Sequence, residues 1–118
     1  MEDKFTIHHS PFTIKFMKVF LYRWRIKPEK EAQFIEAWSE ITAYYRENYD
    51  SLGSRLHRGD DGIFYAYAQW KSDEQRANAF AGRPNTEAGA KMREAIEESF
   101  PEVRLEILSD YLIVPENQ

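Results

Sequence analysis

One histidine in this sequence stands where it could move a proton. His57 is the only histidine between residues 16 and 118, since His8 and His9 lie near the N-terminus. An imidazole ionises near neutral pH, so His57 could act as a general base that removes a phenolic proton. An isolated histidine on a strand is, however, more often a surface residue. His8 and His9 would point to opposite sides of an extended chain, and this spacing does not predict a metal site.

Aromatic side chains on two predicted strands could recognise a flat ring. Rings stack on one another, and a tyrosine hydroxyl can donate a hydrogen bond to a ligand oxygen. The candidates for substrate binding are Tyr22, Trp24, Tyr65 and Tyr67. Successive strand residues point to opposite faces, so alternation separates Tyr65 and Tyr67 from Trp70. We therefore expect one set in a pocket and the other at an interface between subunits.

Basic and amide side chains after Trp70 could hold an anionic oxygen of a ligand. These residues lie on or just after the next predicted helix: Arg76, Asn78 and Arg83. A guanidinium group suits this role because it presents several donors in a fixed plane. The alternative is that all three belong to an ordinary solvated helix face.

The composition excludes several other kinds of site. The chain has no cysteine, so disulfides, thiolate metal sites and a cysteine nucleophile are excluded. The acidic residues do not form a facing pair of carboxylates. The sequence also lacks a glycine-rich phosphate loop, a nucleophile elbow and a cluster with metal-ligand spacing. We therefore expect no metal site.

Charge and hydropathy restrict the partners. The net charge of −4 argues against nucleic acid, because phosphate binding needs a basic field. No apolar run approaches the roughly 18 residues of a membrane span, and the N-terminus lacks the features of a secretory signal. A cytoplasmic protein with no membrane partner is the expectation.

The element that must position these residues is centred on residues 63–75. Aromatic and small apolar residues run to Trp70 without proline or glycine, which predicts a strand. Ser72 and, three residues later, Gln75 form a capping-box pattern, which predicts that a helix begins there. A strand therefore runs into a helix through a connection of about two residues.

The remaining elements follow from periodicity and turn residues. We predict strands at residues 16–26, 52–58 and 102–114, with a turn at 59–62. One helix should begin at Pro28 and end near Asn48. The helix after Ser72 should break at 82–85 and continue over 86–99. Residues 1–15 are expected to form an N-terminal arm or an added edge strand, and residues 16–118 a single domain.

This order predicts an α+β fold, a ferredoxin-like βαββαβ antiparallel sheet with helices on one face. Helices on one face leave the other face uncovered, yet the first, third and last strands are apolar on both faces. An uncovered apolar sheet is an association surface. We therefore expect a homodimer with two-fold symmetry, in which two sheets cover each other.

The run Tyr67-Ala-Gln-Trp70-Lys-Ser-Asp-Glu-Gln75, with the Lys27-Pro28-Glu29 helix start and the element order, resembles the antibiotic biosynthesis monooxygenase family of dimeric α+β barrels. The resemblance covers residues 16–114. Members of that family include oxygenases that act on aromatic polyketides or quinol-like substrates without a metal or flavin, haem-degrading enzymes, and proteins with no assigned reaction. The resemblance implies the fold more strongly than the reaction.

Trp70 matches the tryptophan that lines the pocket in the haem-degrading and polyketide-oxidising members, so the resemblance implies a catalytic role for it. A core packing role is the alternative. Haem degradation is not expected, because the first strand has no asparagine and the helix after Trp70 has no histidine. The expected function is a cofactor-independent monooxygenase that uses O₂ on an aromatic or quinol-type small molecule. The alternative is a non-catalytic, ligand-binding or stress-related dimer.

Overall fold

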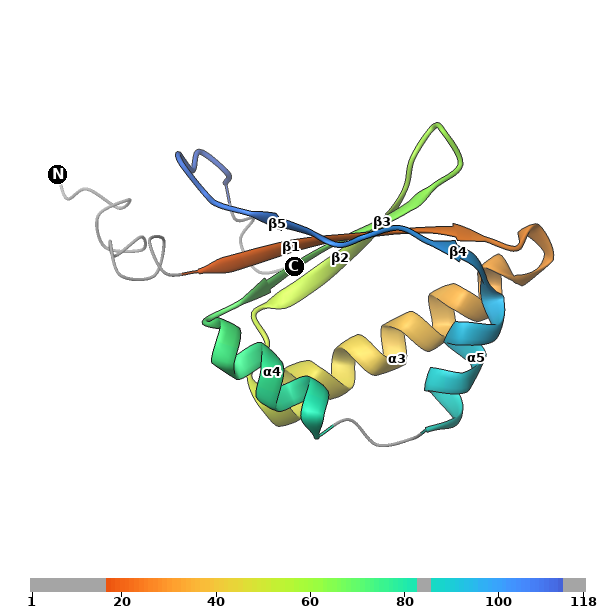
Figure 1. Ribbon diagram of the computed structural model, residues 1–118, viewed down its shortest axis with the longest axis horizontal. Coiled ribbons are helices and arrows are strands. Elements are labelled where there is room, and N and C mark those ends of the chain that lie inside the picture. Colours follow the sequence, from red (N-terminus) through yellow and green to blue (C-terminus); the bar gives the residue numbers. More distant parts are fainter. Residues whose placement is uncertain (1–16, 83–85, 114–118) are drawn as a thin grey trace, which may run out of the picture.

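The computed structural model describes residues 17–82 and 86–113. The elements follow the order β1 (Lys18–Ile26), η1 (Pro28–Lys30), α3 (Glu31–Tyr49), β2 (Gly53–Arg58), β3 (Phe64–Trp70), α4 (Asp73–Ala81), α5 (Glu87–Ala95), β4 (Ile96–Ser99) and β5 (Val103–Leu105). All strand pairs are antiparallel, in the order β2-β3-β1, with β4 and β5 both paired to β1. The three α-helices lie on one face of an open sheet (Figure 1). The predicted ferredoxin-like α+β architecture is confirmed.

Strand register decides which side chains face the helices. Trp24 of β1 lies opposite Phe64 of β3, and Phe20 lies opposite Ala68. The helix-facing residues of β3 are buried, and the residues between them are partly exposed. This alternation is the period of an extended strand packed on one side.

Aromatic packing joins the long helix to the sheet. Phe34 of α3 is fully buried, and its ring centroid lies 5.1 Å from that of Trp24 and 5.6 Å from that of Phe64, edge-on in both pairs. α3 begins just after Pro28, as expected, and ends at Tyr49; the next residue, Asp50, has a left-handed conformation with φ 55°. Such a residue stops a helix and turns the chain into β2.

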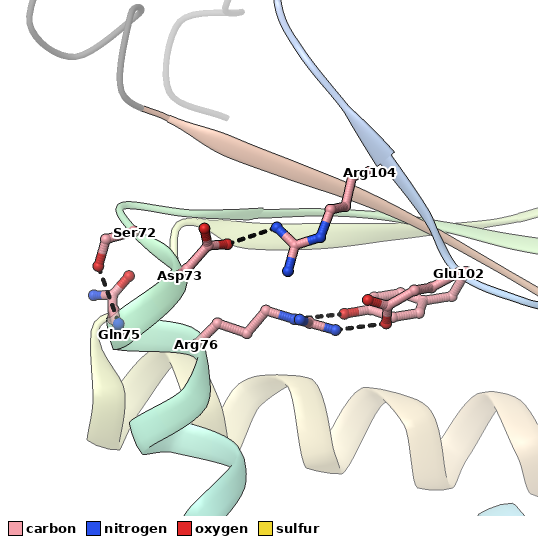
Figure 2. A network of polar contacts seen from close by, with 7 residues as sticks. Ser72, Asp73, Gln75, Arg76, Glu102 and Arg104 are labelled. Atoms are coloured by element: carbon pink, nitrogen blue, oxygen red, sulfur yellow. Dashed lines mark hydrogen bonds and ion pairs between the residues drawn. The ribbon is translucent and has the colours of Figure 1, made fainter.

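The predicted capping box opens α4. The Ser72 hydroxyl accepts a hydrogen bond from the Gln75 backbone N–H at 3.0 Å, as Figure 2 shows. The Gln75 side-chain oxygen accepts from the backbone N–H of Lys71 at 2.8 Å. Both bonds satisfy donors near the helix start, where the helix itself offers no acceptor. The turn from β3 into α4 is therefore fixed locally.

The prediction of a helix over residues 86–99 is wrong at its C-terminal end. α5 stops at Ala95, and β4 then pairs with β1. The Lys27 backbone N–H donates to the Ala95 carbonyl at 2.9 Å, and the Phe100 N–H donates to the Arg23 carbonyl at 3.1 Å. Backbone bonds to β1 thus replace the helical bonds that the apolar spacing suggested.

The prediction of a long last strand over residues 102–114 is also wrong, because β5 covers only Val103–Leu105. Leu105 lies opposite Val19, and β1 begins at Lys18, so the following residues run past the end of β1. Several large apolar residues in this segment are exposed: Leu108, Tyr111, Leu112 and Ile113. The N-terminal arm predicted for residues 1–15 lies outside the described residues.

Candidate functional site

A cavity of about 520 Å³ lies between the helix-facing side of the sheet and the three α-helices. Its wall is mainly aromatic, with contributions from Tyr22, Trp24, Trp38, Tyr45, Trp70 and Phe80. Smaller polar groups and one charged side chain complete it: Thr42, Ser51, Ser54 and Arg93. A volume in the range of about 300–1,000 Å³ with a few polar groups is typical of small-molecule sites.

Tyr22 lines the cavity and is hydrogen-bonded to Arg76 of α4. Arg76 Nε donates to the Tyr22 hydroxyl oxygen at 3.1 Å, and Arg76 Nη2 lies 2.6 Å from Glu102 Oε1. Figure 2 shows Arg76 reaching from α4 toward Glu102, which precedes β5. The guanidinium carbon lies 3.9 Å from the ring centroid of Phe20 and 4.8 Å from that of Phe80. Arg76 is thus fixed by an ion pair and by two aromatic rings.

Tyr22 is suited to donate a hydrogen bond into the cavity. Burial raises the pKa of its hydroxyl above the ordinary value of a tyrosine, although the hydrogen bond from Arg76 and its positive charge act in the opposite direction. The side chain is therefore neutral near pH 7 and keeps its proton. Because its oxygen accepts from Arg76, its O–H remains to donate to a ligand, and the nearby cation makes that O–H a stronger donor.

Trp70 serves both the core and the cavity wall. Its side chain is 3% exposed, and its ring meets those of Tyr45 and Phe80 edge-on, with both centroids 5.9 Å away. It belongs to a buried cluster that also contains Phe20 and Ala79. Trp70 also lines the cavity. A core packing role and a role in the pocket are therefore compatible.

The opposite face of the sheet holds the other predicted site residues. His57 lies opposite Tyr65 in the β2–β3 pair, and its Nδ1 lies 3.3 Å from the Tyr65 carbonyl oxygen. The Tyr65 hydroxyl donates to Asp61 at 2.6 Å, and Tyr67 lies opposite Arg55. None of the three predicted residues His57, Tyr65 and Tyr67 lines the cavity. The structure therefore does not bring His57 and Trp70 together, and His57 faces away from a ligand in the cavity.

Of the three residues predicted on and after α4, one reaches the site. Arg76 does so through Tyr22. Asn78 has an exposed side chain, and its carbonyl oxygen accepts from the Gly82 N–H at the end of α4. Arg83 lies outside the described residues.

Several cavity residues were missed by sequence reasoning. Trp38 and Tyr45 had a signal, because both belong to the apolar stripe of α3. Thr42, Ser54 and Arg93 had none, since ordinary polar residues reach a cavity only through tertiary packing. No Asp, Glu or His is among the residues that line it within the described ranges 17–82 and 86–113. The same ranges contain no cluster of acidic residues and histidines placed to hold a metal ion.

Searches for similar proteins agree with this fold. The sequence model of the antibiotic biosynthesis monooxygenase family matches residues 17–101. No curated protein sequence matches the chain significantly. In the described part of the chain, no helix is long and apolar enough to span a membrane.

Solved structures with a similar fold cover most of the chain. SnoaB of Streptomyces nogalater, described as a cofactor-independent oxygenase, superposes with a TM-score of 0.68 at 14% identity, covering 80% of this chain and 96% of its own. A conserved protein of Methanosarcina mazei Go1 gives 0.69 at 12% identity, covering 80% and 96%. A protein of Caulobacter crescentus CB15 that is named after the same monooxygenase family gives 0.68 at 19% identity, covering 86% and 99%. These structural similarities concern the fold alone, whereas the family model matches the sequence itself. The chain belongs to the antibiotic biosynthesis monooxygenase family.

Proposed function

We propose that this protein is a monooxygenase that oxidises an aromatic or quinol-type small molecule with O₂, without a bound cofactor, in the cavity between the sheet and the helices. The observation that carries the proposal is a half-buried tyrosine, Tyr22, whose hydroxyl is held by Arg76 at the wall of an aromatic cavity. Family membership and the description of SnoaB as a cofactor-independent oxygenase support it.

The reaction needs no external reductant. A phenol in its anionic form can give electrons to O₂, and the ring carbon that loses its hydrogen becomes a carbonyl carbon. One oxygen atom enters the product and the other leaves as water, with all four electrons supplied by the substrate. The Tyr22 hydroxyl would stabilise the negative charge on the substrate oxygen, which is the usual role of a fixed donor near developing charge. The aromatic wall would stack on the substrate ring and exclude water.

The substrate would lose its phenolic proton without help from a carboxylate or an imidazole. No Asp, Glu or His is among the described residues that line the cavity. The substrate therefore enters as its anion, or it releases its proton to solvent at the cavity mouth. This same observation favours the second candidate function, a non-catalytic protein that binds an aromatic ligand in the same cavity.

A cavity-filling substitution tests the proposal. Thr42 lies on α3, is half-buried and lines the cavity. Thr42→Phe should lower O₂ consumption with 1-naphthol and related phenols by at least about tenfold, because a ring there occupies the substrate volume. Rates in an oxygen electrode measure the effect.

The matched control is Ala43→Phe, at the exposed neighbouring position of α3, which should leave the rate unchanged. A protein that binds these ligands but consumes no O₂ would favour the non-catalytic function. Unchanged turnover in Thr42→Phe would show that the reaction does not take place in this cavity.

We also propose that the protein is a homodimer formed through the face of the sheet away from the helices. Leu21 lies opposite Val103 on that face, and Val19 lies opposite Leu105. Val103 and Leu105 are 37% and 39% exposed. A second copy of this sheet would cover the exposed side chains of Val103 and Leu105, as the expected α+β barrel requires.

Leu105→Glu should turn this dimer into a monomer at micromolar concentration, because a carboxylate would be buried without a partner. Sedimentation equilibrium measures the mass. Ile35→Glu is the matched control, since Ile35 is 40% exposed on α3 and should leave the dimer intact. A well-folded monomer for the unaltered chain would refute the dimer.

A further inference from the structure

The charge of the cavity wall is concentrated in one side chain, Arg93. Arg76 donates a hydrogen bond to Tyr22, but its positive charge is compensated by Glu102, whose Oε1 lies 2.6 Å from Arg76 Nη2. Arg93 is the one ionic side chain among the described residues that line the cavity. It forms no ion pair within the described part of the chain, and a lining that holds a lone cation favours an anionic ligand.

The acidic residues near Arg93 on α5 are engaged elsewhere. Glu87 pairs with Lys91 at 3.5 Å. Glu94 accepts a hydrogen bond from Gln33 at 2.8 Å and lies 3.7 Å from Lys30. The pKa of the Glu94 carboxyl is lowered, first by the Gln33 hydrogen bond and then by the charge of Lys30. These contacts hold both carboxylates in bonds with other partners and leave the Arg93 guanidinium available.

Gly89 makes room for this guanidinium. A Cβ atom at Gly89 would lie 3.3 Å from Arg93 Nη1 and 3.4 Å from Thr86 Oγ1, so the Arg93 side chain folds back over the preceding turn of α5. Gly89 also lines the cavity. Glycine inside a helix costs about 1 kcal/mol relative to alanine.

Arg93 and Tyr22 approach the cavity from different elements. Figure 1 shows α4 and α5 near opposite ends of α3. Tyr22 is bonded to Arg76 of α4, whereas Arg93 belongs to α5. A ligand that contacts both groups must carry two polar groups on one aromatic frame. Arg93 is exposed, so its partner group would stay near solvent at the cavity mouth, while a phenolic oxygen would lie inside.

We propose that the cavity takes phenolic aromatic molecules that also carry a carboxylate, with the carboxylate on Arg93 and the phenolic oxygen at Tyr22. This inference rests on the proposed function, because it names the substrate class of the same cavity. A guanidinium group binds a carboxylate through two parallel N–H donors, which fixes the ring orientation as well as adding affinity.

The test compares two ligands that differ in one charge, 5-hydroxy-1-naphthoate and its carboxamide. The unaltered protein should bind the carboxylate about tenfold more tightly than the amide. Arg93→Gln should bind both equally, and Arg93→Lys should keep part of the preference because it keeps the charge. Calorimetric titration under nitrogen gives the dissociation constants without turnover. The preference should shrink at high salt, since Arg93 is exposed.

Lys91→Gln is the matched control, because Lys91 is on α5 and pairs with Glu87 but does not line the cavity. It should keep the full preference. Equal binding of both ligands by the unaltered protein, or a full preference in Arg93→Gln, would overturn the substrate class. In that case, oxidation of the amide would show that the proposed function stands. If neither ligand binds nor is oxidised, the proposed function and the substrate class both fail.

Discussion

Tyr22→Phe should lower kcat/KM for the oxidation of 1-naphthol by about 100-fold. The Tyr22 hydroxyl is a half-buried donor at the cavity wall, and its oxygen is held by Arg76 at 3.1 Å. Phenylalanine keeps the ring but removes the donor that would stabilise the substrate anion. The loss should appear in kcat/KM, because the hydroxyl contacts the anionic oxygen both in the bound substrate and in the transition state for electron transfer to O₂. Steady-state O₂ consumption measures kcat/KM.

Tyr65→Phe is the control for this substitution. Tyr65 also has a bonded hydroxyl, which donates to Asp61 at 2.6 Å, but it lies on the other face of the sheet. Its removal should leave kcat/KM unchanged. A kcat/KM for Tyr22→Phe within twofold of that of the unaltered protein would show that the hydroxyl has no part in the reaction.

The pH dependence of the rate provides a second test of the Tyr22→Phe substitution. Burial raises the pKa of Tyr22, so its hydroxyl keeps the proton throughout the range from about pH 6 to about pH 9. For a substrate phenol that is fully ionised throughout that range, the ratio of the two rates, with and without the hydroxyl, should therefore stay constant. A ratio that fell steadily toward unity as the pH rose would mean that Tyr22 loses its proton there, contrary to the direction of the shift.

Trp70→Ala should lower the free energy of unfolding by about 3–5 kcal/mol. The side chain is 3% exposed, and alanine would leave a space between Tyr45 and Phe80, whose rings now pack edge-on against the indole. The neighbouring capping box holds the backbone after Trp70 in place, so this part of the structure cannot easily close the space. Urea unfolding followed by circular dichroism measures the change.

Trp70→Phe and Trp38→Ala separate packing from catalysis. Phenylalanine at 70 keeps most of the apolar contact, so a folded Trp70→Phe variant reports what the indole adds to turnover. Trp38 also lines the cavity but is only half-buried, so Trp38→Ala should cost clearly less than Trp70→Ala. Equal costs for both alanine variants would contradict the core role assigned to Trp70.

The parts of the fold that local sequence could predict are those fixed by local bonds. Ser72 and Gln75 cap α4 through bonds that span only a few residues. The first helix after Pro28 and the strand that ends at Trp70 likewise carry their own signals. In each case, a short pattern has one low-energy conformation, and tertiary packing does not oppose it.

The predictions that were wrong concern segments whose conformation depends on residues distant in the sequence. Residues 96–99 fit a helical period, but the free edge of β1 offers backbone partners, and β4 forms there instead. The apolar alternation after Leu105 fits a strand. However, β1 begins at Lys18, only one residue beyond the Val19–Leu105 pair, so it offers no further backbone partners. A periodic pattern shows that a segment can form an element, whereas the length of its partner decides whether it does.

The site residues also divide into those that local sequence can place and those that depend on distant residues. Alternation along single strands correctly separates Trp70 from Tyr65 and Tyr67. The position of His57 relative to Trp70 depends instead on the β2–β3 register, which the turn sets through the Gly59 N–H bond to Ile63 and the Gly62 N–H bond to Gly59. Because a shift of one residue would reverse the face of every β2 side chain, His57 could not be placed from its own sequence context.

The measurement that tests the central claim most directly is mass spectrometry of the product formed from 1-naphthol under isotopically labelled O₂. A cofactor-independent monooxygenase should release 1,4-naphthoquinone that carries one labelled oxygen atom, with the other label in water. No label should enter the product from isotopically labelled water under ordinary O₂. Recovery of unchanged 1-naphthol from a protein that binds it, with no O₂ consumed, would contradict the account and identify the cavity as a binding site alone.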